Sequence, residues 1–491
     1  VIGAGPAGAT AARLLAAYGH TTALIGRQAR RRTLGESLPP SCTKLFDRLG
    51  IREAIDHAGF VRSTGNTVRW ANTDARAEQF DAAIRGYQVA RNAFDDLLIA
   101  LARSHPRSSH HEATVQRVVR EQHEGSRWRI EMNGLHGAST LRAAWVLDCS
   151  GRAGVIARHG WRRHDVASRT TAIVAIWERR DAWPVADNTH TIVESYERGW
   201  AWSVPVSASR RYVTIMLDPA VTDVPVQTEL TRAYSAEVAR TSLIRSVVDG
   251  ATQHEPPWGV DASSYSSSHV FADGAVLVGD AASFIDPLSS FGVKKALASA
   301  WLAAVAVHSS LTDPVVTTDA LELYADRERA YYSELQRRSA ALSREVASAN
   351  HSEFWAARAP LDDDGAESLD RADGGPRLEP GDDRLASAFE QLKQRDVIHL
   401  RPGPTMKIVS RAVVRGHQVR LEPHLTSARW ASATRYWRNV DLVLLAELAP
   451  ACDHVPDLLA SYARASGVVP LPDFLSALSA LVAFEFVIFE D

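Results

Sequence analysis

Lysine is rare in this sequence. Only Lys44, Lys294, Lys295, Lys393 and Lys407 occur among 491 residues, so arginine supplies nearly all of the positive charge. The formal net charge of -3 gives no electrostatic reason to expect a general nucleic-acid-binding surface. We therefore expect no nucleic-acid partner, and each lysine can be examined individually as a functional group.

Cysteine is also scarce, and long apolar runs are missing. Cys42, Cys149 and Cys452 lie far apart and form no CxxC pair, which disfavours a disulfide framework or a metal site and fits a reducing cytoplasm. No run of about 18 uncharged apolar residues occurs and no basic-then-apolar leader is seen, so we expect no membrane association. Because the chain starts at Val1 inside an expected strand, we expect native residues ahead of it.

The N-terminal run VIGAGPAGATAARLLAAYGHTTALIGR is typical of a strand, a glycine turn, a helix and a second strand. Gly3 allows the tight turn, Gly5 lets the backbone approach a pyrophosphate, and Gly8 lets the helix pack closely on the strand. With Pro6 and Ala7 opening the helix, a phosphate would lie at the positive end of the helix dipole. The pattern favours a dinucleotide site over a merely structural glycine turn.

One part of this dinucleotide pattern is missing. The acidic residue that usually binds the ribose near the end of the second strand is replaced by Gly26 or Arg27. Arg27 is therefore the candidate contact at that position, and the usual ribose contact is not expected.

Several downstream segments carry a family resemblance, which covers roughly residues 1–345. The chain is similar to the flavin-dependent halogenases and their monooxygenase relatives of the p-hydroxybenzoate-hydroxylase-like fold. The segments that carry it are RRTLGESLPPSCTKLFDRLG, ARNAFDDLLIALA, WVLDCSGRAGVIAR, GWAWSVPV and GAVLVGDAASFIDPLSSFGVKKALASA.

The resemblance implies FAD as the cofactor, reduced by NAD(P)H or by an external flavin reductase. In the family pattern, Arg91 contacts the cofactor, although a solvated arginine on an amphipathic helix would give the same sequence. Asp280 is placed to bind the ribityl hydroxyls, and Ser37 belongs to the family's G-E-S-x-x-P loop. The turn from Pro287 leads through Gly292 and Val293 into a helix whose N-terminus would face the flavin and stabilise negative charge on it.

The aromatic signature W-x-W-x-x-P places Trp200 and Trp202 at the substrate pocket by resemblance, and core packing within a strand would explain them equally well. The phenolic halogenases carry hypohalous acid on a lysine, and the matching position here is Ser63. Phe291 stands before the glycine of the halide-binding turn, where a phenyl ring offers chloride no donor. Lys294 is the remaining catalytic candidate, with a helix-end cation as the alternative.

These departures favour hydroxylation of an aromatic ring through C4a-hydroperoxyflavin. The expected substrate is an indole or a peptide- or protein-bound tryptophan, as in the monooxygenases of tryptophylquinone cofactor biogenesis. Two alternatives stay open, namely a halogenase with a relocated lysine and a catalytically silent protein that binds flavin or peptide.

A chain of 491 residues predicts more than one domain. We expect an α/β fold with a Rossmann-like FAD-binding domain, a β-sheet substrate domain and a mainly helical C-terminal domain that resembles a winged helix. This last domain would either recruit a peptide substrate or cap the catalytic domain. The FAD-binding and substrate domains are expected to interleave along the chain, with approximate ranges of 1–80, 145–165 and 266–345 for the first and 81–144 and 166–265 for the second. A linker or loop is expected at 361–383 and the C-terminal domain at 384–491.

Overall fold

The structure, a computed structural model, divides into two compact units. The first comprises Val1–Thr312 and Tyr324–Asp363, and the second comprises Asp313–Leu323 and Asp364–Asp491. The expected linker at 361–383 lies outside the described residues apart from Asp383. The structure describes residues 1–27, 32–81, 83–123, 125–164, 169–219, 227–289, 291–349, 352–359 and 383–490.

A largely parallel sheet forms the nucleotide-binding half of the first unit. Ile2 bridges in parallel to Ile25 on one side and to Asp148 on the other, so the start of the chain lies between two strands. The expected α/β class with a Rossmann-like domain is confirmed. The strands of this sheet are β1 (Thr22–Ile25), β7 (Ser108–His111), β11 (Val146–Asp148), β20 (Phe271–Ala272) and β21 (Ala275–Leu277).

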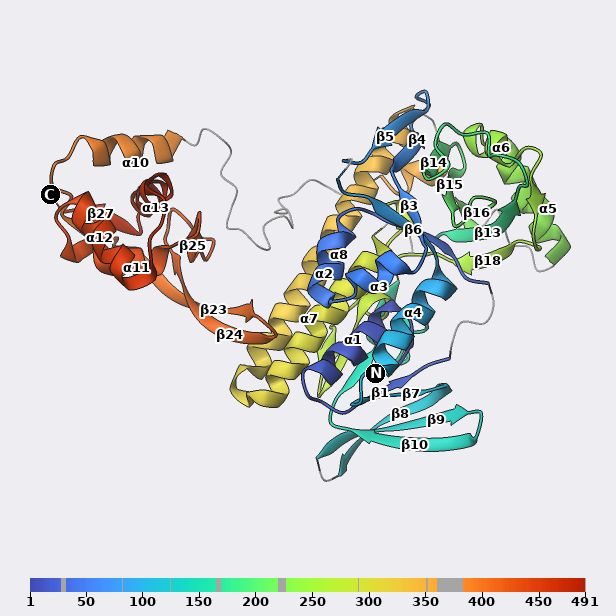
Figure 1. Cartoon of the computed structure of the whole chain (residues 1–491), viewed down its shortest axis with the longest axis horizontal. Coiled ribbons are helices and arrows are strands. Elements are labelled where there is room, and N and C mark those ends of the chain that lie inside the picture. Colours follow the sequence, from blue (N-terminus) through green and yellow to red (C-terminus); the bar gives the residue numbers. More distant parts are fainter. Residues whose placement is uncertain are drawn as a thin grey trace. The chain divides into compact units, whose positions relative to one another are not determined.

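Small side chains allow the helices of this half to pack closely. Helix α1 (Pro6–Ala17) is alanine-rich and buried along most of its length, and it contacts both α4 (Arg91–Arg103) and α7 (Gly292–Thr312). Figure 1 shows these helices together beside the N-terminus. Helix α1 follows the glycine turn, with Gly5 as its N-cap, and α7 begins at Gly292.

A larger, mainly antiparallel sheet forms the other half of the unit. Its strand order is β17-β13-β16-β15-β14-β4-β5, and β18 pairs with β13. One face packs on α5 (Gln227–Arg240) and α6 (Leu243–Val248). The strands are β4 (Gly65–Arg69), β5 (Arg76–Gln79), β13 (Thr171–Glu178), β14 (Thr191–Tyr196), β15 (Gly199–Pro205), β16 (Arg210–Leu217), β17 (Thr252–Gln253) and β18 (Trp258–Asp261).

Strand pairing crosses the domain boundaries expected from the sequence. Strands β4 and β5, expected in the FAD-binding domain, join the large sheet through parallel pairing of β4 with β14. Strand β7, expected in the substrate domain, pairs with β1 of the nucleotide sheet. The two halves of the first unit are therefore interleaved along the chain.

Further elements of the first unit complete its surface and carry parts of the cavity wall. The antiparallel sheet β8–β10 is drawn at the lower edge of Figure 1. These elements are β2 (Gly35–Leu38), β3 (Val61–Ser63), β6 (Gly86–Ala90), β8 (Ala113–His123), β9 (Ser126–Gly134), β10 (Gly137–Ala143), β12 (Arg162–His164), β19 (Tyr265–Ser267), α2 (Cys42–Leu49), α3 (Arg52–His57), α8 (Thr317–Ala349, from Tyr324 onward) and α9 (Glu353–Ala356).

The second unit has its own hydrophobic core, in which Trp430 stacks on Phe484 with ring centroids 4.0 Å apart. As expected for a mainly helical C-terminal domain, the unit contains α11 (Leu442–Leu448), α12 (Val455–Ser466) and α13 (Leu471–Ala483), and the short strand β27 (Val487–Phe489) follows them. The hairpin of β23 (Lys407–Arg415) and β24 (Gln418–Thr426) was not expected. The unit also contains α10 (Asp383–Lys393), β22 (Leu400–Pro402), β25 (Tyr436–Trp437) and β26 (Val440–Asp441).

Within the described part of the chain, no single helix has the length and apolar composition needed to cross a membrane. Helices α12 and α13 reach that composition only as a pair, and their axes are bent by 105° at the break between them.

Candidate functional site

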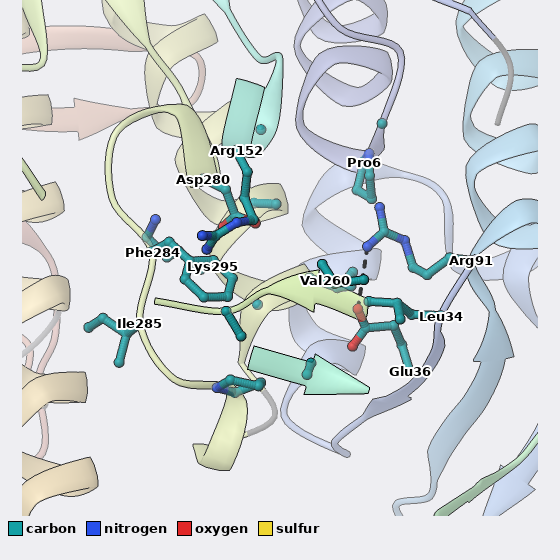
Figure 2. Close-up of a pocket in the computed structure, with 18 of the residues that line it drawn as sticks. Pro6, Leu34, Glu36, Arg91, Arg152, Val260, Asp280, Phe284, Ile285 and Lys295 are labelled. Atoms are coloured by element: carbon teal, nitrogen blue, oxygen red, sulfur yellow. Dashed lines mark hydrogen bonds and ion pairs between the residues drawn. The ribbon is translucent and has the colours of Figure 1, made fainter. Parts of the chain in front are cut away.

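The first unit contains a cavity of about 430 Å³ between the nucleotide half and the large sheet. Figure 2 shows Arg152, Asp280, Lys295 and Phe284 on one side of it, and Arg91 with Glu36 and Leu34 on the other. The expected site residues that line this cavity are Gly3, Gly5, Pro6, Ala7, Ser37, Arg91, Trp200, Trp202, Asp280, Pro287, Gly292 and Val293. Most residues predicted from dispersed motifs thus meet at one place.

The glycine turn is built by close backbone packing. Gly3 has a φ of +103°, and a Cβ at this position would lie 2.3 Å from the carbonyl oxygen of Cys149. A Cβ at Gly8 would lie 1.8 Å from the carbonyl oxygen of Gly3, so Gly8 supports the turn from behind without lining the cavity. At Gly5 the nearest atom to a Cβ is Arg91 Nη2 at 3.9 Å, which leaves the backbone open on the cavity side.

Two helix N-termini are directed at the cavity. Helix α1 begins at Pro6 and helix α7 begins at Gly292, and both residues line the cavity. The first turns of both helices lack acidic residues, so their unpaired N–H groups can stabilise negative charge. An elongated ligand with separated negative groups fits this arrangement.

Arg91 lies at the first position of α4 and faces the glycine turn. Its guanidinium donates to the Asp95 carboxylate at 2.9 and 3.1 Å and to Glu36 Oε1 at 3.3 Å. Burial raises the pKa values of Glu36 and Asp95, and the charge of Arg91 opposes this rise. Arg91 is therefore held rigidly in the cavity wall and is not the solvated arginine of the alternative interpretation.

The D-x-S-G-R turn is held by its aspartate. Asp148 Oδ1 accepts hydrogen bonds from Ser150 N and Oγ at 3.1 and 2.5 Å, and Oδ2 accepts one from Ile156 N at 2.7 Å. This fixes the backbone that presents Arg152 to the cavity. Arg152 in turn pairs with Asp261 at 2.8 Å.

Aromatic and apolar side chains form another part of the wall. The rings of Trp200 and Trp202, on β15, stack with centroids 4.6 Å apart and an interplanar angle of 23°. Phe284, Val193 and Val260 line the same cavity and pack in the same hydrophobic cluster. This surface can hold a flat, apolar ring, although Trp200 also serves the core packing that the sequence left open.

Asp286 is a titratable group in this apolar part that the sequence analysis did not identify. It lines the cavity, and Oδ1 accepts a hydrogen bond from Leu288 N at 3.1 Å. Burial raises its pKa from 3.8 to about 6, opposed by the positive charge of Arg358, the Leu288 N–H and the nearby indole N–H of Trp200. No hydrogen bond of standard geometry forms to Trp200 Nε1 among the described residues. Asp286 can therefore exchange protons near neutral pH.

Some expected site residues lie outside the cavity lining. Arg27 is exposed, and a Cβ at its neighbour Gly26 would lie 2.5 Å from Ala4 N, which explains why no larger residue stands there. Phe291 lies beneath the Lys294 ammonium, with Nζ 5.0 Å from the ring centroid. Neither residue forms part of the wall as the structure describes it.

Ser63 is fully buried and belongs to a series of hydrogen-bonded polar side chains behind the cavity wall. Its Oγ donates to the carbonyl oxygen of Gly65 at 3.1 Å and accepts from Gln88 Nε2 at 3.1 Å. Gln88 also donates to Thr191 Oγ1 at 2.9 Å, and Thr191 lines the cavity. Ser63 is thus connected to the cavity lining through Gln88 and Thr191 and does not line the cavity itself.

Among the described residues, Lys295 is the lysine that lines the cavity, whereas the expected Lys294 is not part of the lining. Lys294 Nζ donates to Ser41 Oγ at 3.0 Å in an exposed setting. Lys295 is 5% exposed, and its Nζ donates to the carbonyl oxygens of Gly279 and Ser283 at 2.9 and 2.5 Å. A step of one residue along a helix turns the side chain by about 100°, and this explains the difference.

The residues fit FAD. The open backbone at Gly5 and the N-termini of α1 and α7 suit a diphosphate and a ring that becomes negative on reduction, while Asp280 lines the wall between these helices. These residues would hold FAD in the cavity.

Comparisons with known proteins agree with this fit. A family profile described as FAD binding domain matches residues 1–330. Tryptophan 2-halogenase of Chondromyces crocatus is 29% identical over 371 residues, which are 73% of this chain and 70% of that protein. The structure of CmlS, a flavin-dependent halogenase, has a TM-score of 0.75 at 23% identity and covers 99% of this chain and 94% of its own.

A second solved structure has the same fold. The peptidyl tryptophan dihydroxylase QhpG, described as essential for tryptophylquinone cofactor biogenesis, has a TM-score of 0.69 at 20% identity and covers 98% of this chain and 97% of its own. The expected resemblance to flavin-dependent halogenases and monooxygenases is confirmed, and with it an oxidoreductase type of flavoenzyme. With residues 1–330 of 491 matched, the chain belongs to the FAD-binding domain family, and its cofactor is FAD.

Proposed function

We propose that this chain is an FAD-dependent monooxygenase that hydroxylates an aromatic ring, with an indole or a peptide-bound tryptophan as substrate. The observation that carries the proposal is the state of Lys295. Its ammonium is buried and donates to two backbone carbonyls, and it is the one lysine in the cavity wall among the described residues. An amine used in this way is not available to carry hypohalous acid.

The substrate class is supported by the apolar part of the cavity. The stacked Trp200 and Trp202 with Phe284 offer flat surfaces on which an aromatic ring can pack. Two similar proteins have a tryptophan substrate in their names. A tryptophan 2-halogenase is similar to this chain in sequence, and a peptidyl tryptophan dihydroxylase is similar to it in fold. The second unit is then a candidate for recruiting a peptide that carries the reacting side chain.

The chain's own residues would bind, orient and deprotonate the substrate. Bound FAD, once reduced by NAD(P)H or by a flavin reductase, supplies the activation of dioxygen. The aromatic wall excludes water and orients the ring. Asp286, with a pKa of about 6, accepts the proton that the substrate ring loses when the new C–O bond forms.

Halogenation is the second candidate, because the relative at 29% identity is a tryptophan 2-halogenase. It requires an amine at the ring that this cavity does not offer in a free form. Halogenated product would therefore also require Lys295 to give up its two carbonyl partners.

The test incubates the full-length chain with FAD, oxygen and either NADPH alone or NADPH with a flavin reductase. Free tryptophan, tryptamine and a tryptophan-containing peptide are supplied with and without bromide, and products are identified by mass spectrometry. We expect a product that has gained oxygen and is unchanged by bromide. A brominated product would establish the halogenase. No product, together with no oxygen consumption beyond that of reduced FAD alone, would show a catalytically silent flavin-binding protein.

A further inference from the structure

Thr191 places a hydroxyl group in the apolar part of the cavity wall. It is the first residue of β14, is 2% exposed and lines the cavity together with Val193, two residues further along the strand. Side chains two residues apart in a strand lie on the same face of the sheet, and Val193 is the cross-strand partner of Trp202. Among the described lining residues that the strands of the large sheet contribute, only Thr191 and Thr214 carry hydroxyl groups.

A buried glutamine orients the Thr191 hydroxyl. Gln88 lies on β6 and is fully buried. Its Nε2 donates to Thr191 Oγ1 at 2.9 Å, to the carbonyl oxygen of Thr189 at 3.1 Å and to Ser63 Oγ at 3.1 Å. Because a carbonyl oxygen can only accept, the bond to Thr189 requires the nitrogen of the amide to point in this direction. Thr189 is held in turn, since its N and Oγ1 both donate to Asp187 Oδ1 at 2.8 Å.

The bond from Gln88 leaves the hydrogen of the Thr191 hydroxyl unused. A hydroxyl group has one hydrogen to donate and two lone pairs that accept, and Gln88 takes one of the lone pairs. Among the described protein contacts, no acceptor takes the Thr191 hydrogen, whereas Ser63 donates its hydroxyl hydrogen to the carbonyl oxygen of Gly65 at 3.1 Å. Since Thr191 lines the cavity, its hydroxyl can donate to a ligand there.

The amide of Gln88 keeps this orientation although one of its atoms stays unsatisfied. Gln88 Oε1 is buried and has no hydrogen-bond partner within the described part of the chain. A buried acceptor without a partner destabilises the folded protein. A reversed amide would accept the Thr191 hydrogen but would lose the bond to the Thr189 carbonyl. The observed orientation is therefore the one that keeps the Thr191 hydrogen free for the cavity.

The surroundings of this hydroxyl favour a neutral acceptor. The groups that hydrogen-bond to Gln88 are one carbonyl and two hydroxyls, and none of them is charged. A carboxylate placed beside them would be buried without a cation, which is costly, whereas a carbonyl oxygen carries no charge. The acceptor that fits Thr191 is therefore a carbonyl oxygen.

We propose that Thr191, oriented by Gln88, determines substrate specificity by donating a hydrogen bond to a carbonyl oxygen attached near the aromatic ring of the substrate. A peptide-bound tryptophan has such an oxygen, and tryptamine lacks it. Thr191 shares its wall with the stacked Trp200 and Trp202, so the same wall binds the ring and the carbonyl. This inference rests on the aromatic substrate proposed above and does not depend on hydroxylation.

The experiment compares two indoles of similar shape, indole-3-acetone and 3-isobutylindole, of which only the first has a carbonyl oxygen. Their dissociation constants are measured by isothermal titration calorimetry with the oxidised, FAD-loaded full-length chain. The dissociation constant of 3-isobutylindole divided by that of indole-3-acetone gives the carbonyl preference. In Thr191→Val this preference should fall about tenfold, because valine has the shape of threonine without the donor. Thr191→Ser should retain it, because serine keeps the hydroxyl.

Thr67→Val is the matched control. Thr67 lies on the neighbouring strand β4, is paired in register with Ile192 and bonds to His190 Nδ1 at 3.0 Å, and it is not among the residues that line the cavity. Its replacement should leave the carbonyl preference unchanged. Gln88→Met should lower the preference, since the Thr191 hydroxyl loses the bond that orients it. Gln88→Met therefore provides the second test if Thr191→Val does not fold.

The outcomes separate this inference from the proposed activity. The inference is overturned if Thr191→Val keeps the wild-type preference, if Thr191→Ser loses it, or if Thr67→Val reproduces the loss. If the wild type binds neither indole, the aromatic substrate is wrong and this inference falls with it. Because no reductant is present, a chain that halogenates instead of hydroxylating would still show the carbonyl preference.

Discussion

Arg91 Nη1 lies 3.3 Å from Glu36 Oε1, while the same guanidinium pairs with Asp95 one helical turn further along α4. The Arg91 guanidinium thus pairs with the carboxylates of both Glu36 and Asp95, and burial raises the pKa of each of these two groups. The arrangement ties the G-E-S loop to the helix that faces the glycine turn. It also makes Arg91 sensitive to substitution in two separate ways.

Replacing Arg91 by glutamine should weaken FAD binding and reduce stability together. The two carboxylates lose their partner, and breaking such partly buried pairs costs about 1 to 3 kcal/mol. Fluorescence titration with FAD and thermal unfolding measure the two effects. Arg103→Gln, at the exposed end of the same helix, is the control and should change neither. An Arg91→Gln protein with unchanged FAD affinity would remove Arg91 from the site.

Alanine at Gly8 and at Gly5 should have different effects. At Gly8 the new Cβ would meet the Gly3 carbonyl at 1.8 Å, so the turn must shift and the protein should lose several kcal/mol of stability together with FAD binding. At Gly5 the apoprotein has room for the Cβ, so its melting temperature should stay near that of the wild type. The Cβ would nevertheless block the approach of the diphosphate, and FAD affinity should fall. Equal melting temperatures for both variants would contradict this account.

Asp286→Asn should slow product formation about a hundredfold or more, because the amide cannot accept a proton. In the wild type the rate should rise with pH through about 6, the pKa of Asp286, and the variant should lack this rise. FAD content and substrate affinity serve as controls and should be unchanged. A variant that keeps the rise would show that another group takes the proton.

The same substitution gives a stability test that does not depend on activity. The pKa of Asp286 is raised on folding from 3.8 to about 6, so the folded protein holds the proton more tightly than the unfolded chain. Stability from this group is present at low pH and is lost as pH rises from about 4 to 6. Asp286→Asn should therefore raise the melting temperature at pH 7.5 relative to the wild type, and not at pH 4.

Ser63→Lys should destabilise the protein rather than create a halogenase. The position is fully buried, and its hydrogen-bonding neighbours, the Gly65 carbonyl and the Gln88 amide, bring no negative charge. An unpaired ammonium there is costly. Thermal unfolding and product analysis with bromide check both parts, and brominated product from a stable variant would contradict the placement of Ser63 behind the wall.

Motifs with fixed spacing could be located from the sequence because their geometry is local. The glycine turn, the start of α7 and the helices of the second unit follow from periodicity and turn residues. Which of Lys294 and Lys295 lines the cavity could not be predicted from the sequence. It depends on how α7 is rotated about its axis relative to cavity-lining residues from other segments. Asp286 was visible in the sequence, but its raised pKa arises from burial by residues distant in the chain.

The missed hairpin of the second unit did have a local signal. Gly416, with a φ of +62°, lies between the runs that form β23 and β24, and the second of these runs alternates in polarity. Strand pairings that cross the expected boundaries, such as β4 with β14, had no such signal. They depend on contacts between segments far apart in the chain.

The place of Ile2 between Ile25 and Asp148 has a consequence for synthesis on the ribosome. The segment around Ile2 is made before both of its neighbours in the nucleotide sheet, and the second neighbour, β11, appears only after β10. The N-terminus of α7 follows later still. At this stage of synthesis the nascent chain contains the glycine turn but not yet the segments that pack against it. Assembly must wait for contacts of long sequence separation, which slow folding. FAD can then bind to the complete cavity only after α7 has been synthesised. Bound FAD would contact segments that were synthesised at widely separated times.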